Sequence, residues 1–171
     1  MLHSNLRRHC QAVVDGLSLP RPFSAEALCR QLSEERGRPL HVLPLPAAAS
    51  AAGACGLWLA TGTSDWIFVE QCTSPAHQEH IVLHEIGHML FDHHNLVLDD
   101  EQDLSHLFTD LGPNLLRRFL ARANYSTRQE QEAEMVASLI RTAAERYPAE
   151  QPREVMDKLE AALGFGARHA R

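Results

Sequence analysis

The chain has few cysteines, no Cys-x-x-Cys pair and no long apolar run. Its four cysteines, Cys10, Cys29, Cys55 and Cys72, are far apart in the 171 residues, which argues against a structural zinc knuckle. The N-terminal residues do not lead into an apolar signal core, and no apolar run reaches the length of about 18 residues that a membrane span needs. We therefore expect a cytoplasmic protein with reduced thiols and no membrane contact.

Positive charge is also scarce. The chain has 16 Lys and Arg against 22 Asp and Glu, a formal net charge of −6. A nucleic-acid-binding surface normally needs a basic patch, and the most basic short stretch, 117–122, is typical of one face of a helix. We expect no direct nucleic-acid contact, and the negative balance favours a basic protein partner.

The length and the 44% hydrophobic content predict a single domain over 1–171 with a real core. Apolar residues at helical spacing predict two helices in the N-terminal part, about 1–37. A small mixed or antiparallel sheet is expected over about 39–71, and Gly62 lies in its predicted hairpin turn. Three short apolar runs predict its strands: 39–44, 56–61 and 65–70. The Ala- and Ser-rich stretch 46–53 is expected to be a loop, with a short helical turn as the weaker alternative.

Two long helices are predicted after the sheet. Ser74 and Pro75 supply a capping hydroxyl and a proline at the first helical position, and this helix is expected over about 75–94. The C-terminal helical part, about 112–163, includes a long helix capped by Ser126. The sequence thus predicts an α+β fold in which these two helices pack together beneath the sheet.

The chemistry is concentrated in the run His84-Glu85-Ile86-Gly87-His88. Residues four apart share one face of a helix, so the two histidines can bind one tetrahedral zinc ion. Glu85 is about 100° further round the helix and faces the open coordination position. This is the His-Glu-x-x-His pattern of metallopeptidases, in which zinc acidifies its bound water and Glu85 takes the proton as general base. Gly87 is expected where the helix passes close to another element.

The third ligand can be assigned in more than one way. His94 has the spacing of the third histidine of the metzincins, but that pattern needs a glycine where Phe91 stands. A glutamate on the helix after Ser126 is the better candidate, because Glu130 shares a face with small alanines that let two helices approach. Glu134 is the reserve candidate, either as a ligand or as a partner of a ligand. The expected site is therefore one Zn²⁺ held by His84, His88 and Glu130.

These residues resemble the ImmA/IrrE family of bacterial zinc metallopeptidases. The resemblance rests on His84-Glu85-Ile86-Gly87-His88 with a following His93, and on Glu130-x-Glu132-Ala133-Glu134 followed by Val136-Ala137-x-Leu139-Ile140. It implies a cytoplasmic enzyme with a gluzincin-type ligand set that cleaves or destabilises a partner helix-turn-helix repressor. The family usually has Asn at the position of Glu134, which leaves the ligand register between Glu130 and Glu134 open.

Other polar residues have smaller expected roles. His80 and Asp92 are each one turn from a ligand histidine and could orient its ring. Tyr125 is a candidate for stabilising the tetrahedral oxyanion. The remaining histidines of this region are expected to be surface or packing residues: His77, His93, His94 and His106.

Two rival functions fit the same residues. A non-catalytic zinc protein could act by binding a helix-turn-helix regulator, since an intact Glu85 permits catalysis without proving it. A zinc hydrolase could instead act on a small molecule. A narrow closed pocket would favour the small molecule, and an open groove beside a sheet edge would favour a peptide.

Overall fold

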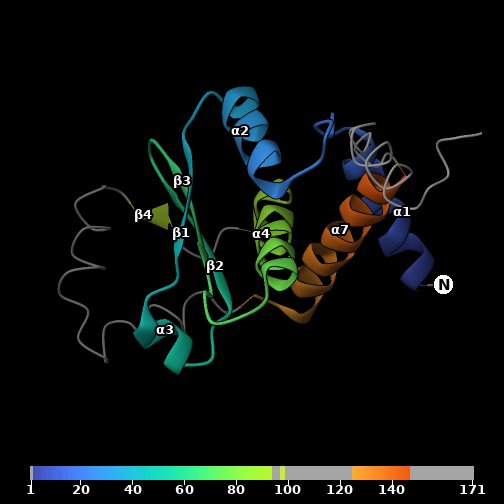
Figure 1. The fold of residues 1–171 in the computed structure, drawn as a ribbon. Helices are drawn as coiled ribbons and strands as arrows, with labels where there is room; N and C mark the ends of the chain where they lie inside the picture. Colours follow the sequence, from blue (N-terminus) through green and yellow to red (C-terminus); the bar gives the residue numbers. More distant parts are fainter. Residues whose placement is uncertain (1, 94–96, 99–124, 147–171) are drawn as a thin grey trace, which may run out of the picture.

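A central helix, α4 (Pro75–Leu90), separates a small sheet from a pair of packed helices (Figure 1). The structure is a computed structural model that describes residues 2–93, 97–98 and 125–146. One face of α4 covers strands β2 and β3, and α4 also packs against the long helix α7. The predicted α+β fold, with the His-Glu-x-x-His helix between the sheet and a glutamate-bearing helix, is confirmed.

The N-terminal part consists of two helices, α1 (Leu2–Asp15) and α2 (Ala25–Arg36). The side chain of Ser24 accepts a hydrogen bond from the Ala27 amide and caps the start of α2. Gly37 ends α2 in the left-handed conformation, with φ 62°, a conformation that glycine adopts without strain. Both predicted N-terminal helices are confirmed.

The sheet is mixed and has the strand order β1-β3-β2-β4. Strands β2 and β3 form the predicted antiparallel hairpin, and β1 pairs in parallel with β3 at one edge. A further strand of two residues, β4, pairs in parallel with the end of β2. The bounds are β1 Leu40–Pro44, β2 Gly56–Thr61, β3 Asp65–Val69 and β4 Val97–Leu98.

The stretch expected to be a loop contains a short helix, α3 (Ala47–Ala51). The loop prediction over 46–53 was therefore wrong in part. Alanine has the highest helix propensity, and burial of Ala49 anchors this single turn.

Helix α4 begins where predicted, with Ser74 accepting from the His77 amide, but it ends at Leu90 and not near residue 94. Asp92 takes a left-handed φ of 55°, and the His93 amide then donates to the His88 carbonyl. This turn satisfies a helix-end carbonyl and folds the chain back onto the last turn of α4.

Helix α7 (Thr127–Glu145) carries the glutamates of the candidate site. Ser126 and Gln129 form a capping box that fixes its first turn. Apolar residues of α7 join a continuous core with α4, α2, α1 and the sheet. Its fully buried members include Leu28, Ile67, Leu83, Ile86, Val136 and Ile140.

Several predictions fall outside the described residues. These are the parts of the C-terminal helical region (about 112–163) before residue 125 and after residue 146, and the placements of His94 and His106. Among the helices that the structure describes, none has the length and apolar character needed to cross a membrane.

Candidate metal centre

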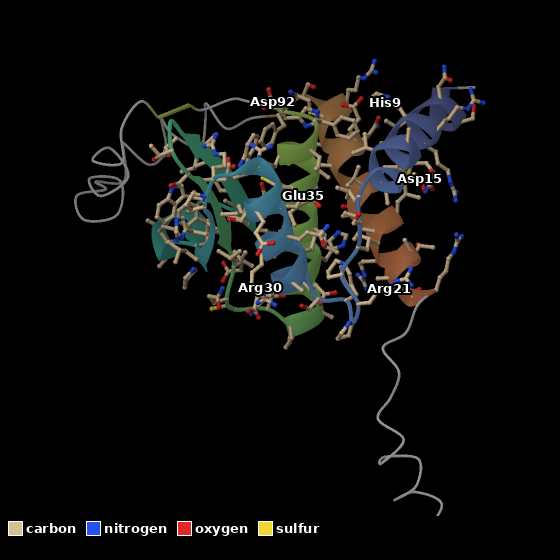
Figure 2. The ribbon with its side chains drawn as sticks, turned by 90° about the horizontal axis from the view of Figure 1, so that it is seen from above. His9, Asp15, Arg21, Arg30, Glu35 and Asp92 are labelled. Carbon is tan, nitrogen blue, oxygen red and sulfur yellow. The ribbon has the colours of Figure 1, made fainter. Side chains whose placement is uncertain are left out.

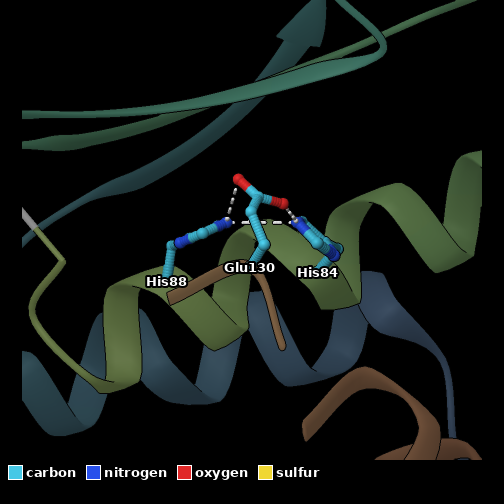
Figure 3. Close-up of side chains that lie close together, drawn as sticks. All are labelled: His84, His88 and Glu130. Atoms are coloured by element: carbon cyan, nitrogen blue, oxygen red, sulfur yellow. Dashed lines mark hydrogen bonds and ion pairs between the residues drawn. The ribbon is translucent and has the colours of Figure 1, made fainter. Parts of the chain in front are cut away.

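Three side chains from two helices converge on one point, as Figure 3 shows. They are His84 and His88 of α4 and Glu130 of α7, and their potential ligand atoms all lie within 4.8 Å of one another. Within the described residues, this is the only group of three or more His, Cys, Asp or Glu side chains so arranged. The group could hold a metal ion.

The spacing of these atoms fits a tetrahedral ion. The Nε2 atoms of His84 and His88 are 3.1 Å apart. Glu130 places one carboxylate oxygen 3.2 Å from His84 Nε2 and the other 3.7 Å from His88 Nε2. Tetrahedral zinc with bonds of about 2.0–2.1 Å sets its ligand atoms about 3.3–3.4 Å apart. The separation of the two Nε2 atoms and that of Glu130 Oε2 from His84 Nε2 are close to this value, and Glu130 approaches His88 at a longer distance through its other oxygen.

The ring of His88, a candidate ligand, is buried and neutral. Its side chain is almost fully buried, and burial together with the nearby His84 and His93 lowers its pKa to about 3. A group with so low a pKa stays unprotonated at neutral pH, which leaves a lone pair for a metal.

Close helix packing brings Glu130 to the histidines. A Cβ placed on Gly87 would lie 2.7 Å from Ala133 Cα and 2.8 Å from the Ala133 carbonyl oxygen. The expectation that Gly87 marks a close approach is confirmed, as is the role of small residues on α7. Glu130 is one turn before Ala133, so the same crossing places its carboxylate beside the histidines.

Glu85 lies beside the cluster, between α4 and strand β2. Its side chain is buried, and the Trp58 backbone N–H donates to its carboxylate. Its Oε2 atom has no hydrogen-bond partner among the described residues. Burial and the charge of Glu130 raise the pKa of Glu85 to about 8, and the Trp58 bond opposes this shift.

A cleft of about 560 Å³ opens over these groups. Its floor is formed by Glu85 and the three candidate ligands, and its far wall is the segment from Ala52 to Leu57. The wall includes glycines and alanines, so the backbone at the start of β2 borders the cleft. A metal ion at the cluster would therefore be accessible from this cleft.

Glu134 contacts a candidate ligand, His84, and is not a member of the three-residue group. Its Oε2 atom lies 3.4 Å from His84 Nδ1 and 3.1 Å from His80 Nε2. His80, considered above as a residue that could orient a ligand ring, is linked to the candidate ligand His84 through this shared carboxylate. Of the two candidate registers, the geometry places Glu130, and not Glu134, against both Nε2 atoms.

His93 was expected to be a surface or packing residue, and it is buried and stacked on the Phe91 ring, with polar contacts in addition. Only 6% of the residue is exposed, and its Nδ1 lies 3.0 Å from Nδ1 of His88. Its other ring nitrogen lies 3.2 Å from Glu132 Oε2. Asp92, the other residue considered as a partner of a ligand, is exposed and forms the left-handed turn that folds His93 back.

Tyr125 precedes α7 and covers one face of the His88 ring. The two rings are stacked, with centroids 3.6 Å apart and planes inclined by 15°. Tyr125 also lines the cleft, and burial plus the charges of Glu85 and Glu130 raise its pKa above the usual value. The residue thus presents a neutral phenol to the site, as a hydrogen-bond donor would require.

Comparison with protein-family models, curated proteins and solved structures finds no match to this chain.

Proposed function

We propose that the protein is a zinc-dependent peptidase in which His84, His88 and Glu130 hold the ion and Glu85 is the general base. The observation that carries the proposal is the near-tetrahedral spacing of two imidazole nitrogens and a carboxylate beside a buried carboxylate. Two histidines, one glutamate and an open position are the donor set of gluzincin peptidases. The unpaired Oε2 of Glu85 fits a group that exchanges a proton with a reactant.

Zinc bound there would supply a Lewis acid that acidifies water and polarises a carbonyl oxygen. Glu85 has the position to accept a proton from water in the cleft and return it to the leaving amine. The Trp58 amide holds the Glu85 carboxylate by one hydrogen bond while Oε2 stays available. Tyr125, which stacks on His88 and lines the cleft, would donate from its phenol to the oxyanion that develops at the attacked carbonyl.

The edge of β2 favours an extended peptide as substrate. The backbone N–H of Trp58 donates to Glu85 and therefore points away from β3, the strand that pairs with β2 on the other side. The outer edge of β2 thus faces the cleft. Within the described residues, β4 pairs with Ala60 and Thr61 only, which leaves the start of β2 without a strand on that side. A substrate chain could pair there as an added strand, which aligns its peptide bonds with the metal.

The resemblance to ImmA/IrrE enzymes supplies the partner class. A helix-turn-helix repressor has a basic DNA-binding surface, and the net charge of −6 would favour association with that surface. We place the substrate in this class on that resemblance and on the charge balance.

The test compares the wild-type chain with Glu85→Gln on a library of internally quenched fluorescent peptides, with zinc supplied. We expect cleavage that a chelator abolishes and zinc restores. Glu85→Gln should retain zinc but lose activity by about 10²–10⁴-fold, because the general base is removed. If zinc-loaded wild type cleaves neither these peptides nor an unfolded protein, the peptidase proposal is wrong. That result would favour the rival function, a non-catalytic zinc protein that binds a regulator.

A further inference from the structure

Two buried polar side chains behind the metal cluster have no role in the proposed chemistry. They are His93, which follows α4, and Glu132 of α7, exposed by only 6% and 7%. Burying an imidazole and a carboxylate is costly unless their polar atoms are hydrogen-bonded. Their position, directly behind His88 and away from the cleft, suggests that they act through that residue.

The polar atoms form one continuous chain from His88 to the protein surface. His88 Nδ1 lies 3.0 Å from His93 Nδ1, and His93 Nε2 lies 3.2 Å from Glu132 Oε2. Arg128 then donates from Nε to Glu132 Oε1 over 3.0 Å. Each buried nitrogen and oxygen in this chain therefore has one partner.

The direction of each bond follows from the chemistry of the groups. Arg128 can only donate, and an ionised Glu132 can only accept, so His93 must carry its proton on Nε2. A neutral His93 then has its lone pair on Nδ1 and accepts from Nδ1–H of His88. This leaves the lone pair of His88 on Nε2, the nitrogen that faces His84 and Glu130.

We propose that His93 and Glu132 are positioning residues that hold His88 in the tautomer and ring orientation needed to bind the metal. The inference rests on the metal site of the proposed function, and it does not require that the site cleave peptides. Partners that orient a ligand imidazole in this way raise its basicity and the metal affinity of the site. In this protein a second histidine, His93, lies between the candidate ligand His88 and the carboxylate of Glu132.

The surroundings hold these two side chains in place. The Phe91 ring lies against both His9 of α1 and His93, at centroid distances of 5.2 and 5.4 Å. Cys10 Sγ, also on α1, donates to the Glu132 carbonyl at 3.8 Å. Figure 2 shows His9 and the Asp92 turn on the same side of the molecule.

By contrast, the side chain of Glu134, which contacts His84, is 55% exposed, so water can replace it more easily.

The first test measures zinc affinity by competition with a chromophoric chelator in wild type, His93→Phe and His93→Asn. Phe keeps an aromatic ring but removes both ring nitrogens, and we expect about 10- to 100-fold weaker zinc binding. Asn places its side-chain carbonyl near the former Nδ1, so it should accept from His88 and recover most of the affinity. His41→Phe is the matched control, because His41 stacks on Trp66 at the opposite side of the sheet.

The second test reads the tautomers directly in the metal-free full-length chain, by long-range ¹H–¹⁵N correlation of labelled histidines at neutral pH. We expect His88 protonated on Nδ1 and His93 protonated on Nε2. A proton on Nε2 of His88 would overturn the proposal, as would unchanged zinc affinity in a folded His93→Phe. If the wild type takes up no zinc, the proposed function fails, but the tautomers still decide whether the positioning chain exists.

Discussion

Gly87 of α4 packs so closely against Ala133 of α7 that α4 has no room for a side-chain atom at Gly87. A Cβ at Gly87 would lie 2.7 Å from Ala133 Cα, well inside normal contact. Both residues are buried, and the crossing lies between the two histidines on one helix and Glu130 on the other. The distance between the helices therefore determines whether three ligands reach one ion.

Gly87→Ala is expected to destabilise the protein although alanine favours helix. Overpacking a close crossing costs about 1–3 kcal/mol, against a gain of up to about 1 kcal/mol in helix propensity. We expect a net loss of about 1–2 kcal/mol in the free energy of unfolding, measured by urea denaturation of the metal-free protein. Zinc affinity should fall as well, because α7 must move away.

Gly62→Ala is the control for that substitution. Gly62 lies in the hairpin turn, and a Cβ there would meet nothing within 4 Å. A stability change at Gly62 equal to that at Gly87 would contradict the view that the helix crossing is the cause.

The candidates for the third metal ligand can be distinguished by measuring the metal content of three variants. Wild type should hold about one zinc per chain, and Glu130→Gln should lose most of it because a tetrahedral site needs its third protein ligand. Glu134→Gln should retain zinc with an affinity lowered by about 10-fold at most, since Glu134 lies against Nδ1 of His84 and Nε2 of His80, and not against the Nε2 atoms of His84 and His88. Retention of zinc by Glu130→Gln together with its loss in Glu134→Gln or His94→Ala would assign the third ligand elsewhere.

The main features of the site could be predicted because they depend on local rules. The i, i+4 spacing of His84 and His88 follows from helix geometry, and Ser74 marks the helix start by its capping side chain. The alanines after Glu130 predicted a close helix contact, and Ala133 makes it. Such signals are read from a few adjacent residues.

His93 and Glu132 could not be predicted in the same way. The fold-back of His93 depends on Asp92 adopting a left-handed φ, which a non-glycine residue rarely does and the sequence does not signal. Glu132 stands in a run of glutamates that is typical of a solvated helix face. Its burial is a tertiary effect of α1 and of the turn after α4.

The four cysteines should divide into two reactive and two protected thiols. Cys55 and Cys72 are exposed, whereas Cys10 and Cys29 are buried. Burial raises the pKa of Cys29 to about 11, so at neutral pH it is almost entirely the unreactive thiol. We expect two fast equivalents per native chain with a colorimetric disulfide reagent, and four after denaturation.

The rate at which Cys29 reacts should rise with pH. Because the Cys29 pKa is raised, its thiolate fraction should grow only as the pH rises towards 11, provided the protein stays folded. Mass spectrometry of digested, alkylated protein would identify the sites. Rapid labelling of Cys29 in the native chain at neutral pH would contradict the placement of α2 against the core.

Gly56→Ala should impair the proposed peptidase while leaving the metal site in place. A Cβ at Gly56 would lie 2.6 Å from Glu85 Oε1 and 2.5 Å from Ile81 Cγ2, so the Glu85 carboxylate must move. A displacement of about 1 Å at a catalytic group can cost about 10²-fold in rate, and we expect a loss of that order in kcat/KM. Zinc content should stay at the wild-type level, because the three heavy atoms nearest to the added Cβ belong to Ile81 and Glu85 and not to the candidate ligands. Full activity in a folded, zinc-loaded Gly56→Ala chain would show that the position of Glu85 against β2 does not matter, and would count against Glu85 as the base.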